Sequence, residues 1–277
     1  MQKQPIVLFI GAGNMAQSLI SGLVASGFER SHIGISDHHP ANLQRFANQF
    51  EGIQTHSSNL KASLSADILV LCVKPQDMRP LAVELQAVFR ERNPLLISIA
   101  AGIHTEHLEQ WLDTRTAIVR AMPNTPALLG AGATGLYANS RVSEEQKSLA
   151  ESLLRAVGIT VWMNHEHDLD VVTALSGSGP AYFFLMMEAL QQCAEKLGLS
   201  SSTARLLTLQ TALGAARMAL ESDITLEELR KKVASKGGAT ERALSTLEDG
   251  GFRALIQSAL QSAKERSIEI SHFFDKE

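Results

Sequence analysis

The fold is decided by the opening stretch Ile6-Val7-Leu8-Phe9-Ile10-Gly11-Ala12-Gly13-Asn14-Met15-Ala16. A short apolar run ends in a glycine turn, and the turn leads into a segment whose apolar residues Leu19, Leu23 and Val24 have helical spacing. A dinucleotide-binding fingerprint requires strand, glycine turn and helix in this order. The first glycine makes the turn, the second lets the backbone approach a pyrophosphate, and Ala16 allows close packing of helix on sheet. The stretch therefore predicts nucleotide binding rather than a bare structural turn.

Short β-rich runs alternate with amphipathic helical segments up to about residue 163. The expected strands are 6–10, 32–36, 68–73, 95–99, 117–119 and 159–162. The runs 68–73 and 95–99 are apolar throughout, as strands buried on both faces of a parallel sheet are. This alternation predicts an α/β Rossmann domain at residues 1–163, doubly wound around a mainly parallel sheet.

From residue 164 the β-branched clusters give way to Ala, Leu, Met, Gln and Glu at helical spacing. We expect helices at 168–175, 180–197, 202–221, 225–233, 240–248 and 252–271. The apolar run Tyr182-Phe183-Phe184-Leu185-Met186-Met187 gives one helix a broad apolar face, which is either helix-helix core or a subunit interface. We favour the interface, and so predict an all-α dimerisation and substrate-binding domain at residues 164–277 and a homo-oligomer.

Bulk composition excludes several classes of protein. The chain has 277 residues, enough for two domains, and its 45% hydrophobic and 19% charged residues are typical of globular proteins. The net charge of -4 offers no basic surface for nucleic acid or for an anionic membrane. Cys72 and Cys193 lie in apolar contexts, which favours reduced core residues over a disulfide or a metal site. The N-terminal segment lacks the features of a signal peptide and no apolar segment is long enough to span a bilayer, so we expect a cytoplasmic protein.

Two positions after expected strands bear on the coenzyme. Asp37 follows the second strand, where an acidic side chain accepts hydrogen bonds from the ribose hydroxyls of NAD and repels the extra phosphate of NADP. Asp37 therefore favours NADH, although partly protonated His38 and His39 would offset the repulsion. Lys74 follows the strand 68–73 at the sheet edge where ligands bind, and its ammonium group either reaches the coenzyme or substrate or is solvated.

A second glycine turn lies far from the first, in the stretch Val233-Ala234-Ser235-Lys236-Gly237-Gly238-Ala239-Thr240. A Gly-Gly turn that opens a helix presents several backbone N–H groups to one point, which suits a small carboxylate. The hydroxyl of Thr240 is a further donor, unless it serves only to cap the helix. The sequence therefore predicts a coenzyme site at the first turn and a substrate site at Gly237 and Gly238.

Four segments, taken in order, resemble pyrroline-5-carboxylate reductases. They are Phe9 to Ala16, then Arg120-Ala121-Met122-Pro123-Asn124-Thr125-Pro126, then Ala174-Leu175-Ser176-Gly177-Ser178-Gly179-Pro180-Ala181-Tyr182, and the Gly237-Gly238 turn. The resemblance covers the whole chain, and the second and third segments are far more specific than the glycine fingerprint.

The resemblance implies reduction of the cyclic imine 1-pyrroline-5-carboxylate to L-proline with NADPH or NADH, the last step of proline biosynthesis. It also implies a Rossmann domain followed by a helical domain that dimerises by interlocking, with dimers assembling into decamers. The coenzyme is expected to contact Ile10, Gly11, Ala12, Gly13, Asn14, Met15, Asp37, Asn59, Val73, Lys74 and Ala100. Proline or its imine precursor is expected to contact Glu166, Ala239 and Thr240.

Two residues depart from the family pattern. Lys236 stands where the family usually has proline, which leaves the turn less restricted in φ and adds a cation near the expected carboxylate or in solvent. Asp37 stands where the family often has a small uncharged residue, which puts a preference for NADPH in doubt.

Imine reduction needs a hydride at carbon and a proton on nitrogen, and a basic imine nitrogen needs only a weak donor. The motifs described above accordingly contain no His-Asp pair, no Ser-His arrangement and no metal-binding HExxH spacing. We expect Thr240 to be the catalytic donor, Glu166 to hold the ring nitrogen or a water, and the stiff loop 123–126 to shape the nicotinamide end or to be a rigid turn. Ser178 is expected to cap a helix, and the role of Ser176 stays open.

Two other classes of protein fit parts of the pattern. A β-hydroxyacid dehydrogenase or another imine reductase also joins a Rossmann domain to helices, but it usually carries a lysine on the first long helix, where this chain has Pro180-Ala181-Tyr182-Phe183-Phe184-Leu185. A non-catalytic nucleotide sensor would give no turnover at all.

Overall fold

The structure is a computed structural model that describes residues 4–275. Its strands are β1 (Val7–Ile10), β2 (Ile33–Ser36), β3 (Gln54–His56), β4 (Ile68–Leu71), β5 (Leu95–Ser98), β6 (Ile118–Met122), β7 (Gly132–Ala138) and β8 (Gly158–Trp162). Its α-helices are α1 (Asn14–Ala25), α2 (Pro40–Gln49), α3 (Asn59–Ser63), α4 (Met78–Glu91), α5 (Thr105–Leu112), α6 (Glu144–Arg155), α7 (Asp168–Val172), α8 (Gly179–Lys196), α9 (Ser201–Leu220), α10 (Leu226–Val233), α11 (Ala239–Asp249) and α12 (Phe252–His272). Short segments are η1 (Arg30–His32), η2 (Pro75–Asp77), η3 (Thr125–Leu129) and the π-helical η4 (Thr173–Gly177).

The chain divides into two compact units. The first comprises the chain up to Ser178 together with residues 263–277, and the second comprises Gly179–Ser262. Helix α12 therefore starts in the second unit and ends in the first. This division falls later in the chain than the predicted domain boundary after residue 163. That boundary stays a prediction, which expression of the separate fragments would test.

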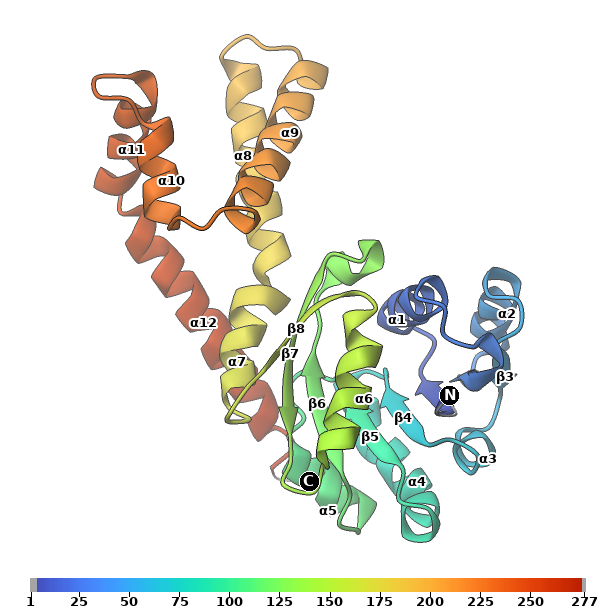
Figure 1. Cartoon of the computed structure of the whole chain (residues 1–277). Coiled ribbons are helices and arrows are strands. Elements are labelled where there is room, and N and C mark those ends of the chain that lie inside the picture. Colours follow the sequence, from blue (N-terminus) through green and yellow to red (C-terminus); the bar gives the residue numbers. More distant parts are fainter. Residues whose placement is uncertain (1–3, 276–277) are drawn as a thin grey trace. The chain divides into compact units, whose positions relative to one another are not determined.

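The first unit contains one eight-stranded sheet in the order β3-β2-β1-β4-β5-β6-β7-β8 (Figure 1). Neighbouring strands are parallel except for β6 and β7, which are antiparallel. Since the strand order runs outward from β1 in one direction and from β4 in the other, the point where the winding reverses lies between these two strands. The predicted doubly wound, mainly parallel Rossmann sheet is confirmed.

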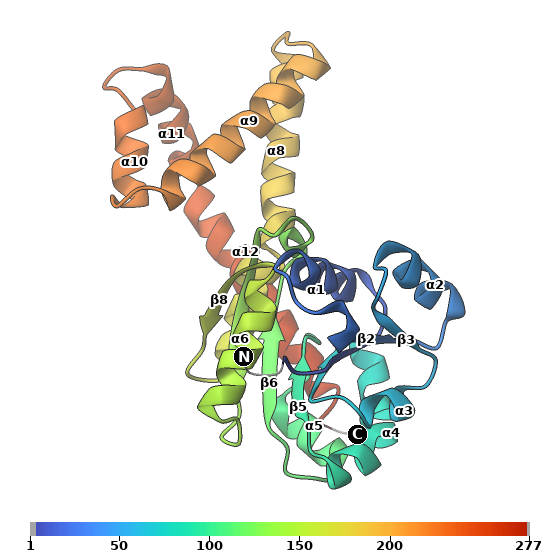
Figure 2. The same cartoon turned by 45° about the vertical axis from the view of Figure 1, so that its right-hand side comes forward.

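Two hydrophobic layers cover the sheet because successive strand residues point to opposite faces. Val7 and Phe9 pack with buried residues of α1, α2 and α6 on one face. Leu8 and Ile10 pack with buried residues of α3, α4 and α5 on the other. Figure 2 shows α1 and α2 near one end of the sheet and α3, α4 and α5 below it. The central strands β1, β2, β4 and β5 are buried along their whole length, which the continuous apolar runs 68–73 and 95–99 predicted for β4 and β5.

Two strands were not expected from the sequence. Strand β3 has the sequence Gln54-Thr55-His56 at the edge of the sheet, and its first two residues are exposed, so it lacks an apolar signal. Strand β7 has the sequence Gly132-Ala133-Thr134-Gly135-Leu136-Tyr137-Ala138, in which glycine and alanine hide the usual β-branched pattern. The antiparallel part of the sheet was therefore missed.

The second unit is entirely helical, as predicted. Helices α8 and α9 lie side by side as a helical hairpin (Figure 1). Only Gly179 and Ala204 are buried in this unit of the single chain, while Phe183, Phe184 and Leu206 are 64–68% exposed. Within the single chain, this unit has no hydrophobic core in which these apolar side chains are buried. No helix within residues 4–275 is long and apolar enough to cross a membrane.

Candidate functional site

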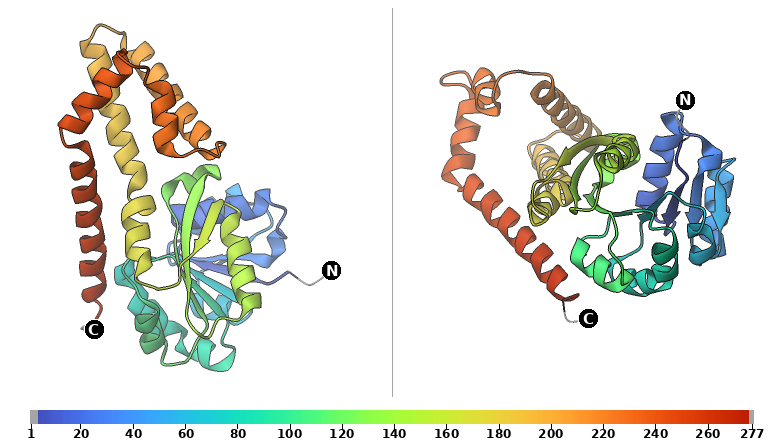
Figure 3. Two further views of the ribbon diagram at one scale, coloured as in Figure 1. Left: turned by 60° about the vertical axis from the view of Figure 1, so that its left-hand side comes forward. Right: turned by 60° about the horizontal axis from the view of Figure 1, so that its bottom comes forward.

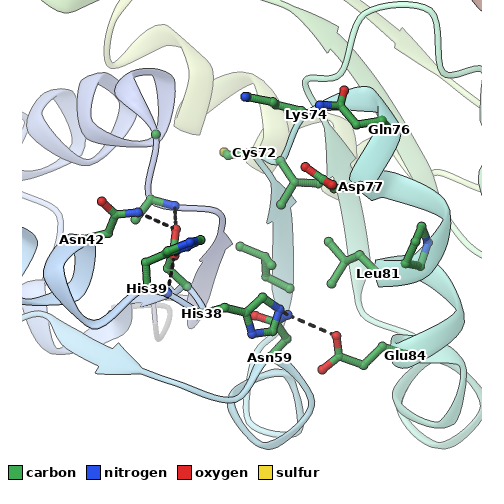
Figure 4. Close-up of a pocket in the computed structure, with 16 residues that line it drawn as sticks. His38, His39, Asn42, Asn59, Cys72, Lys74, Gln76, Asp77, Leu81 and Glu84 are labelled. Carbon is green, nitrogen blue, oxygen red and sulfur yellow. Dashed lines mark hydrogen bonds and ion pairs between the residues drawn. The ribbon is translucent and has the colours of Figure 1, made fainter.

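A cavity of about 810 Å³ opens in the first unit at the carboxyl ends of the strands around the reversal point (Figure 4). Ligands of doubly wound sheets bind at this place. The cavity is lined by Ile10, Ala12, Gly13, Asp37, His38, His39, Asn42, Asn59, Cys72, Val73, Lys74, Gln76, Asp77, Pro80, Leu81 and Glu84. The residues come from the segments that follow β1, β2 and β4 and from α3 and α4, so distant parts of the sequence meet here.

The glycine loop between β1 and α1 has the geometry that a pyrophosphate requires. Gly11 has φ of +100°, and a Cβ atom at this position would lie 2.9 Å from the carbonyl carbon and oxygen of Cys72, so only glycine fits. Gly13 caps α1 without a side-chain hydrogen bond, no heavy atom comes within 4 Å of its ideal Cβ position, and the first turn of α1 contains no acidic residue. The first N–H groups of α1 are thus suited to an anion. This backbone fits a dinucleotide coenzyme.

Asp37 is the centre of the hydrogen bonds beside this loop. Its Oδ2 accepts from the backbone N–H of Ala12 at 2.8 Å and from Asn42 at 3.3 Å, and its Oδ1 accepts from the backbone N–H of His39 at 2.8 Å. His39 and Asn42 lie on the same side of the cavity (Figure 4). Burial by itself raises the pKa of the Asp37 carboxyl, but these hydrogen bonds together hold the pKa below its ordinary value. The side chain is therefore an anion at neutral pH.

Asn59, the first residue of α3, connects three parts of the cavity wall. Its Oδ1 accepts from the hydroxyl of Ser36 at 2.7 Å, and its Nδ2 donates to Glu84 of α4 at 3.2 Å. The same Nδ2 lies 3.2 Å from Nε2 of His38. Asn59 is only 2% exposed. It orients the two side chains that form the lower wall in Figure 4, His38 and Glu84.

The other predicted coenzyme residues fall into two groups. Val73 and Lys74 line the cavity beyond β4, and Lys74 lies across it from His39 and Asn42 (Figure 4). Asn14 and Met15 belong to the first turn of α1, and buried Ala100 follows β5; none of these three lines the cavity.

Three carboxylates and a single lysine face the cavity. Asp37, Asp77 and Glu84 face it together with Lys74 and two histidines. A ligand that brings an additional phosphate to the Asp37 side meets a carboxylate held by several donors. The arrangement therefore disfavours a 2′-phosphate there.

Glu166 precedes α7, and most of the hydrogen-bond accepting positions of its carboxylate are taken by other residues of the chain. Its Oε1 accepts from the backbone N–H of Thr105 at 2.7 Å and from Arg120 at 3.3 Å, and its Oε2 accepts from the hydroxyl of Thr105 at 2.7 Å. Arg120 is buried, which lowers the pKa of its guanidinium, while the carboxylates of Glu166 and Asp170 act in the opposite direction. Since a carboxylate has about four accepting positions, roughly one on Oε2 remains open to a further donor.

The loop after β6, predicted to be stiff from its two prolines, is joined to neighbouring elements by hydrogen bonds of Asn124. Asn124 donates from Nδ2 to the carbonyl oxygen of Ser176 at 2.9 Å and accepts from the backbone N–H of Ala133 at 2.9 Å. The hydroxyl of Ser176 donates to the carbonyl oxygen of Val172 at 3.0 Å, inside its own helical segment. Asn124 thus ties the loop to η4 and β7.

The glycine turn of the second unit has the predicted place at the start of α11. Gly237 has φ of +74°, a conformation that favours glycine, and Gly238 caps the helix without a side-chain hydrogen bond. Ala239 and Thr240 form the first turn, and the Thr240 hydroxyl has no hydrogen-bond partner among residues 4–275. However, the N–H of Gly237 donates to the Glu241 carboxylate at 2.6 Å, so an acidic side chain of the chain itself already uses one donor.

Several residues that line the cavity of the first unit were not predicted from the sequence. Asn42, Gln76, Asp77, Pro80, Leu81 and Glu84 line it, and Cys72 was read only as a core residue. Burial raises the pKa of the Cys72 thiol far above its ordinary value, so this thiol is inert at neutral pH. Asn42 could have been suspected from its place in the segment after Asp37, whereas no local signal points to Glu84. Within residues 4–275 no group of three or more His, Cys, Asp or Glu side chains is arranged to hold a metal ion.

Comparisons with known proteins agree over the whole chain. Residues 166–270 match the family model of the pyrroline-5-carboxylate reductase dimerisation domain, and residues 6–102 match the model of coenzyme F420-dependent NADP oxidoreductases. The chain is 49% identical to the pyrroline-5-carboxylate reductase of Pseudomonas aeruginosa over 96% of this chain and 97% of the relative.

Two solved structures extend the likeness to the fold. A pyrroline-5-carboxylate reductase from Coxiella burnetii superposes with a TM-score of 0.93 at 46% identity, covering 97% of this chain and 99% of the other. The Plasmodium falciparum pyrroline carboxylate reductase, solved with NADP bound, gives a TM-score of 0.86 at 29% identity, covering 98% and 100%.

Proposed function

The chain belongs to the pyrroline-5-carboxylate reductase family, and from this premise we propose how its residues divide the work of the reaction. The enzyme reduces 1-pyrroline-5-carboxylate to L-proline with NAD(P)H, the final step of proline biosynthesis. The observation that carries this conclusion is the 49% identity over nearly the full length of both chains. The other classes considered, a hydroxyacid dehydrogenase and a nucleotide sensor, do not fit this membership.

The coenzyme is assigned to the cavity of the first unit. We place its pyrophosphate at the N-terminus of α1 beside Gly11, Ala12, Gly13, Asn14 and Met15, because the first turn of this helix contains no acidic residue. The N–H of Ala12 is bonded to Asp37, so the donors assigned to the pyrophosphate are those of Gly13, Asn14 and Met15. Its adenosine ribose is placed at Asp37 and Asn59, and its remaining length along Ile10, Val73, Lys74 and Ala100. When bound, NAD(P)H supplies the hydride.

The substrate is assigned to the glycine turn of the second unit. The amides of Gly237, Gly238 and Ala239 are proposed to hold the carboxylate of the imine, which needs donors rather than a metal. Thr240 is proposed to donate its free hydroxyl to the ring nitrogen or the carboxylate. Glu166 is proposed to accept a hydrogen bond from the ring nitrogen through the open position on Oε2.

On this assignment the residues of the chain mainly bind and orient the coenzyme and the imine, and none of them forms a covalent bond to the substrate. The hydride is transferred to the imine carbon, and the nitrogen takes the proton that makes it a secondary amine. A protonated imine needs no strong acid, so orientation by main-chain amides and by Thr240 accounts for the rate, through effects worth several kcal/mol.

NADH is proposed as the preferred coenzyme. The support is the anionic Asp37 at the ribose end, with Asp77 and Glu84 as further carboxylates on the wall. Steady-state kinetics with NADH and NADPH side by side, with and without pyrroline-5-carboxylate, test the whole assignment. Oxidation of neither coenzyme in the presence of the imine contradicts the activity, and a large NADPH advantage contradicts only the preference.

The enzyme is an oligomer that acts on a small molecule, consistent with its match to a dimerisation domain. We propose that dimers assemble further into a decamer, since α8 and α9 expose large apolar side chains in the single chain. A molar mass near ten subunits by light scattering is expected, and a mass of two subunits contradicts the decamer. A cytoplasmic location stays a prediction that cell fractionation tests.

A further inference from the structure

One face of α2 is directed at the glycine loop. Asn42, Arg45 and Gln49 have the spacing i, i+3, i+7, which places them on one side of a helix. Each makes a hydrogen bond in that direction: Asn42 donates to Asp37 at 3.3 Å, Arg45 donates to the carbonyl oxygen of Ala12 at 2.7 Å, and Gln49 accepts from Gln17 of α1 at 3.0 Å. Helix α2 thus contacts the loop at Ala12, the carboxylate of Asp37 beside the loop, and the helix that follows it.

Both backbone groups of Ala12 are held by charged side chains. Its N–H donates to Oδ2 of Asp37 at 2.8 Å, and its carbonyl oxygen accepts from Nη2 of Arg45 at 2.7 Å. Ala12 is only 2% exposed, so its backbone groups are largely shielded from water, although Arg45 itself is exposed. The guanidinium carbon of Arg45 also lies 5.4 Å from the ring centroid of buried Phe46, which limits its movement.

These bonds determine the direction of the next peptide. The carbonyl oxygen held by Arg45 belongs to the peptide whose N–H is that of Gly13, the residue that caps α1. Gly13 and its neighbours carry the donors that suit a pyrophosphate. Since glycine is the most flexible residue, an external hold on this peptide restricts donors that would otherwise reorient.

We propose that Arg45 is a positioning residue for the coenzyme, which fixes the glycine loop in its binding conformation before the coenzyme arrives. This inference rests on the proposed function of the cavity. Arg45 acts through Ala12, because its guanidinium group donates to the Ala12 carbonyl oxygen at 2.7 Å.

A positioning role and a phosphate-binding role have different consequences. An arginine that binds the 2′-phosphate matters only for NADPH, whereas an arginine that holds the loop matters equally for NADH and NADPH, since both share the pyrophosphate. A residue that only stabilises the fold lowers the melting temperature without changing coenzyme affinity in the folded enzyme.

The experiment compares Arg45→Met, Arg45→Lys and the control Arg30→Met in the full-length enzyme. Arg30 makes the same kind of bond, from Nη1 to the carbonyl oxygen of Glu51 at 3.0 Å, but away from the loop. Dissociation constants of NADH and NADPH are measured by fluorescence titration without substrate, together with KM, kcat and Tm.

For Arg45→Met, both dissociation constants should rise by about tenfold and by the same factor, as expected for loss of one charge-assisted hydrogen bond. The kcat should change by less than about twofold, because a coenzyme that is bound is still correctly placed. Arg45→Lys should recover part of the affinity, since an ammonium group can still donate to the carbonyl oxygen. Arg30→Met should leave both constants unchanged.

Three outcomes overturn the proposal. A change confined to NADPH makes Arg45 a phosphate ligand, unchanged constants make it a structural residue only, and an equal effect of Arg30→Met shows a general loss of stability. Failure of the proposed function is seen separately, because the titrations use no substrate. A wild-type enzyme that binds coenzyme but does not reduce pyrroline-5-carboxylate contradicts the function and leaves the role of Arg45 standing.

Discussion

The two glycine turns have nearly the same backbone but different surroundings. The residue that caps α1, Gly13, has φ of -84° and ψ of -177°, and the residue that caps α11, Gly238, has φ of -83° and ψ of 169°. Neither receives a side-chain cap. At the first turn Asp37 and Arg45 hold both backbone groups of buried Ala12, whereas at the second turn Glu241 is bonded to the N–H of exposed Gly237.

This comparison shows that an anion-binding helix start is defined by its neighbours as much as by its glycines. The first turn is fixed before any ligand arrives, because other elements hold its backbone. The second turn satisfies one of its own donors with its own carboxylate, so a substrate carboxylate has to compete for it.

Gly11→Ala should have the largest effect. The added methyl group would lie 2.9 Å from the Cys72 carbonyl at φ of +100°, so β1 and β4 must separate where the coenzyme binds. We expect the dissociation constants of NADH and NADPH to rise on the order of a hundredfold, measured by titration. Gly27→Ala is the control, because Gly27 has φ of +85° but no atom within 4 Å of the added methyl group. Equal affinity loss in both variants contradicts the role given to the close approach.

Thr240→Ala tests whether the second turn takes part in the reaction. Loss of a donor to the substrate should lower kcat/KM for pyrroline-5-carboxylate by about tenfold to a hundredfold, with coenzyme affinity unchanged. Thr246→Ala is a matched control on the same helix, since that hydroxyl only donates to the carbonyl oxygen of Arg242 at 3.1 Å. Full catalytic efficiency of Thr240→Ala removes the threonine from the mechanism.

Asp37→Asn tests the electrostatic part of the first turn. The amide keeps an oxygen for the Ala12 N–H but removes the charge, so kcat/KM for NADPH relative to NADH should rise by about tenfold. Because the pKa of Asp37 lies below the ordinary 3.8, the wild-type discrimination by this carboxylate should be constant between about pH 6 and pH 8. Asp77→Asn removes a charge elsewhere on the wall and should change the ratio much less. An equal change would show that only the total charge of the cavity matters.

Glu241→Gln should have the smallest effect and the opposite sign. Removal of a carboxylate that competes for the Gly237 amide should lower KM for pyrroline-5-carboxylate by about twofold to threefold, because exposed charges interact weakly. Glu228→Gln is the control, since Glu228 accepts from the backbone N–H of Thr225 at 2.9 Å at the start of α10. A KM that rises in Glu241→Gln shows that this carboxylate supports the turn and does not compete with the substrate.

The regions that the sequence predicted well are those where several local signals coincide. At β1 and α1 an apolar run, two glycines and a helical period all occur within 6–25, and the long helices of the second half repeat one period over several turns. Strands β3 and β7 carry weak signals, since the first is polar and the second is rich in glycine and alanine. Their pairing depends on the rest of the sheet.

The sequence positions of the site residues could be predicted better than their hydrogen-bond partners. Asp37 could be placed after its strand, but its bonds to Ala12 and Asn42 depend on how α2 packs. The partners of Glu166, Thr105 and Arg120, lie 61 and 46 residues away and are brought to it by the folded sheet. Glu241 did have a local signal, because an acid three residues after a helix cap commonly bonds back to the backbone.

The return of α12 to the first unit affects how the C-terminus can be handled. The C-terminal end of α12 lies near α5 (Figure 3). Ser267 donates to Asp170 at 2.7 Å, Phe274 packs edge-on against Trp111, and His107 of α5 lies 2.8 Å from Asp275. Proteolytic trimming of the tail therefore strips cover from the nucleotide-binding unit and leaves the helical unit whole. A purification tag placed after the last residue is likewise attached to the nucleotide-binding unit, and a short, uncharged spacer is the safer choice there.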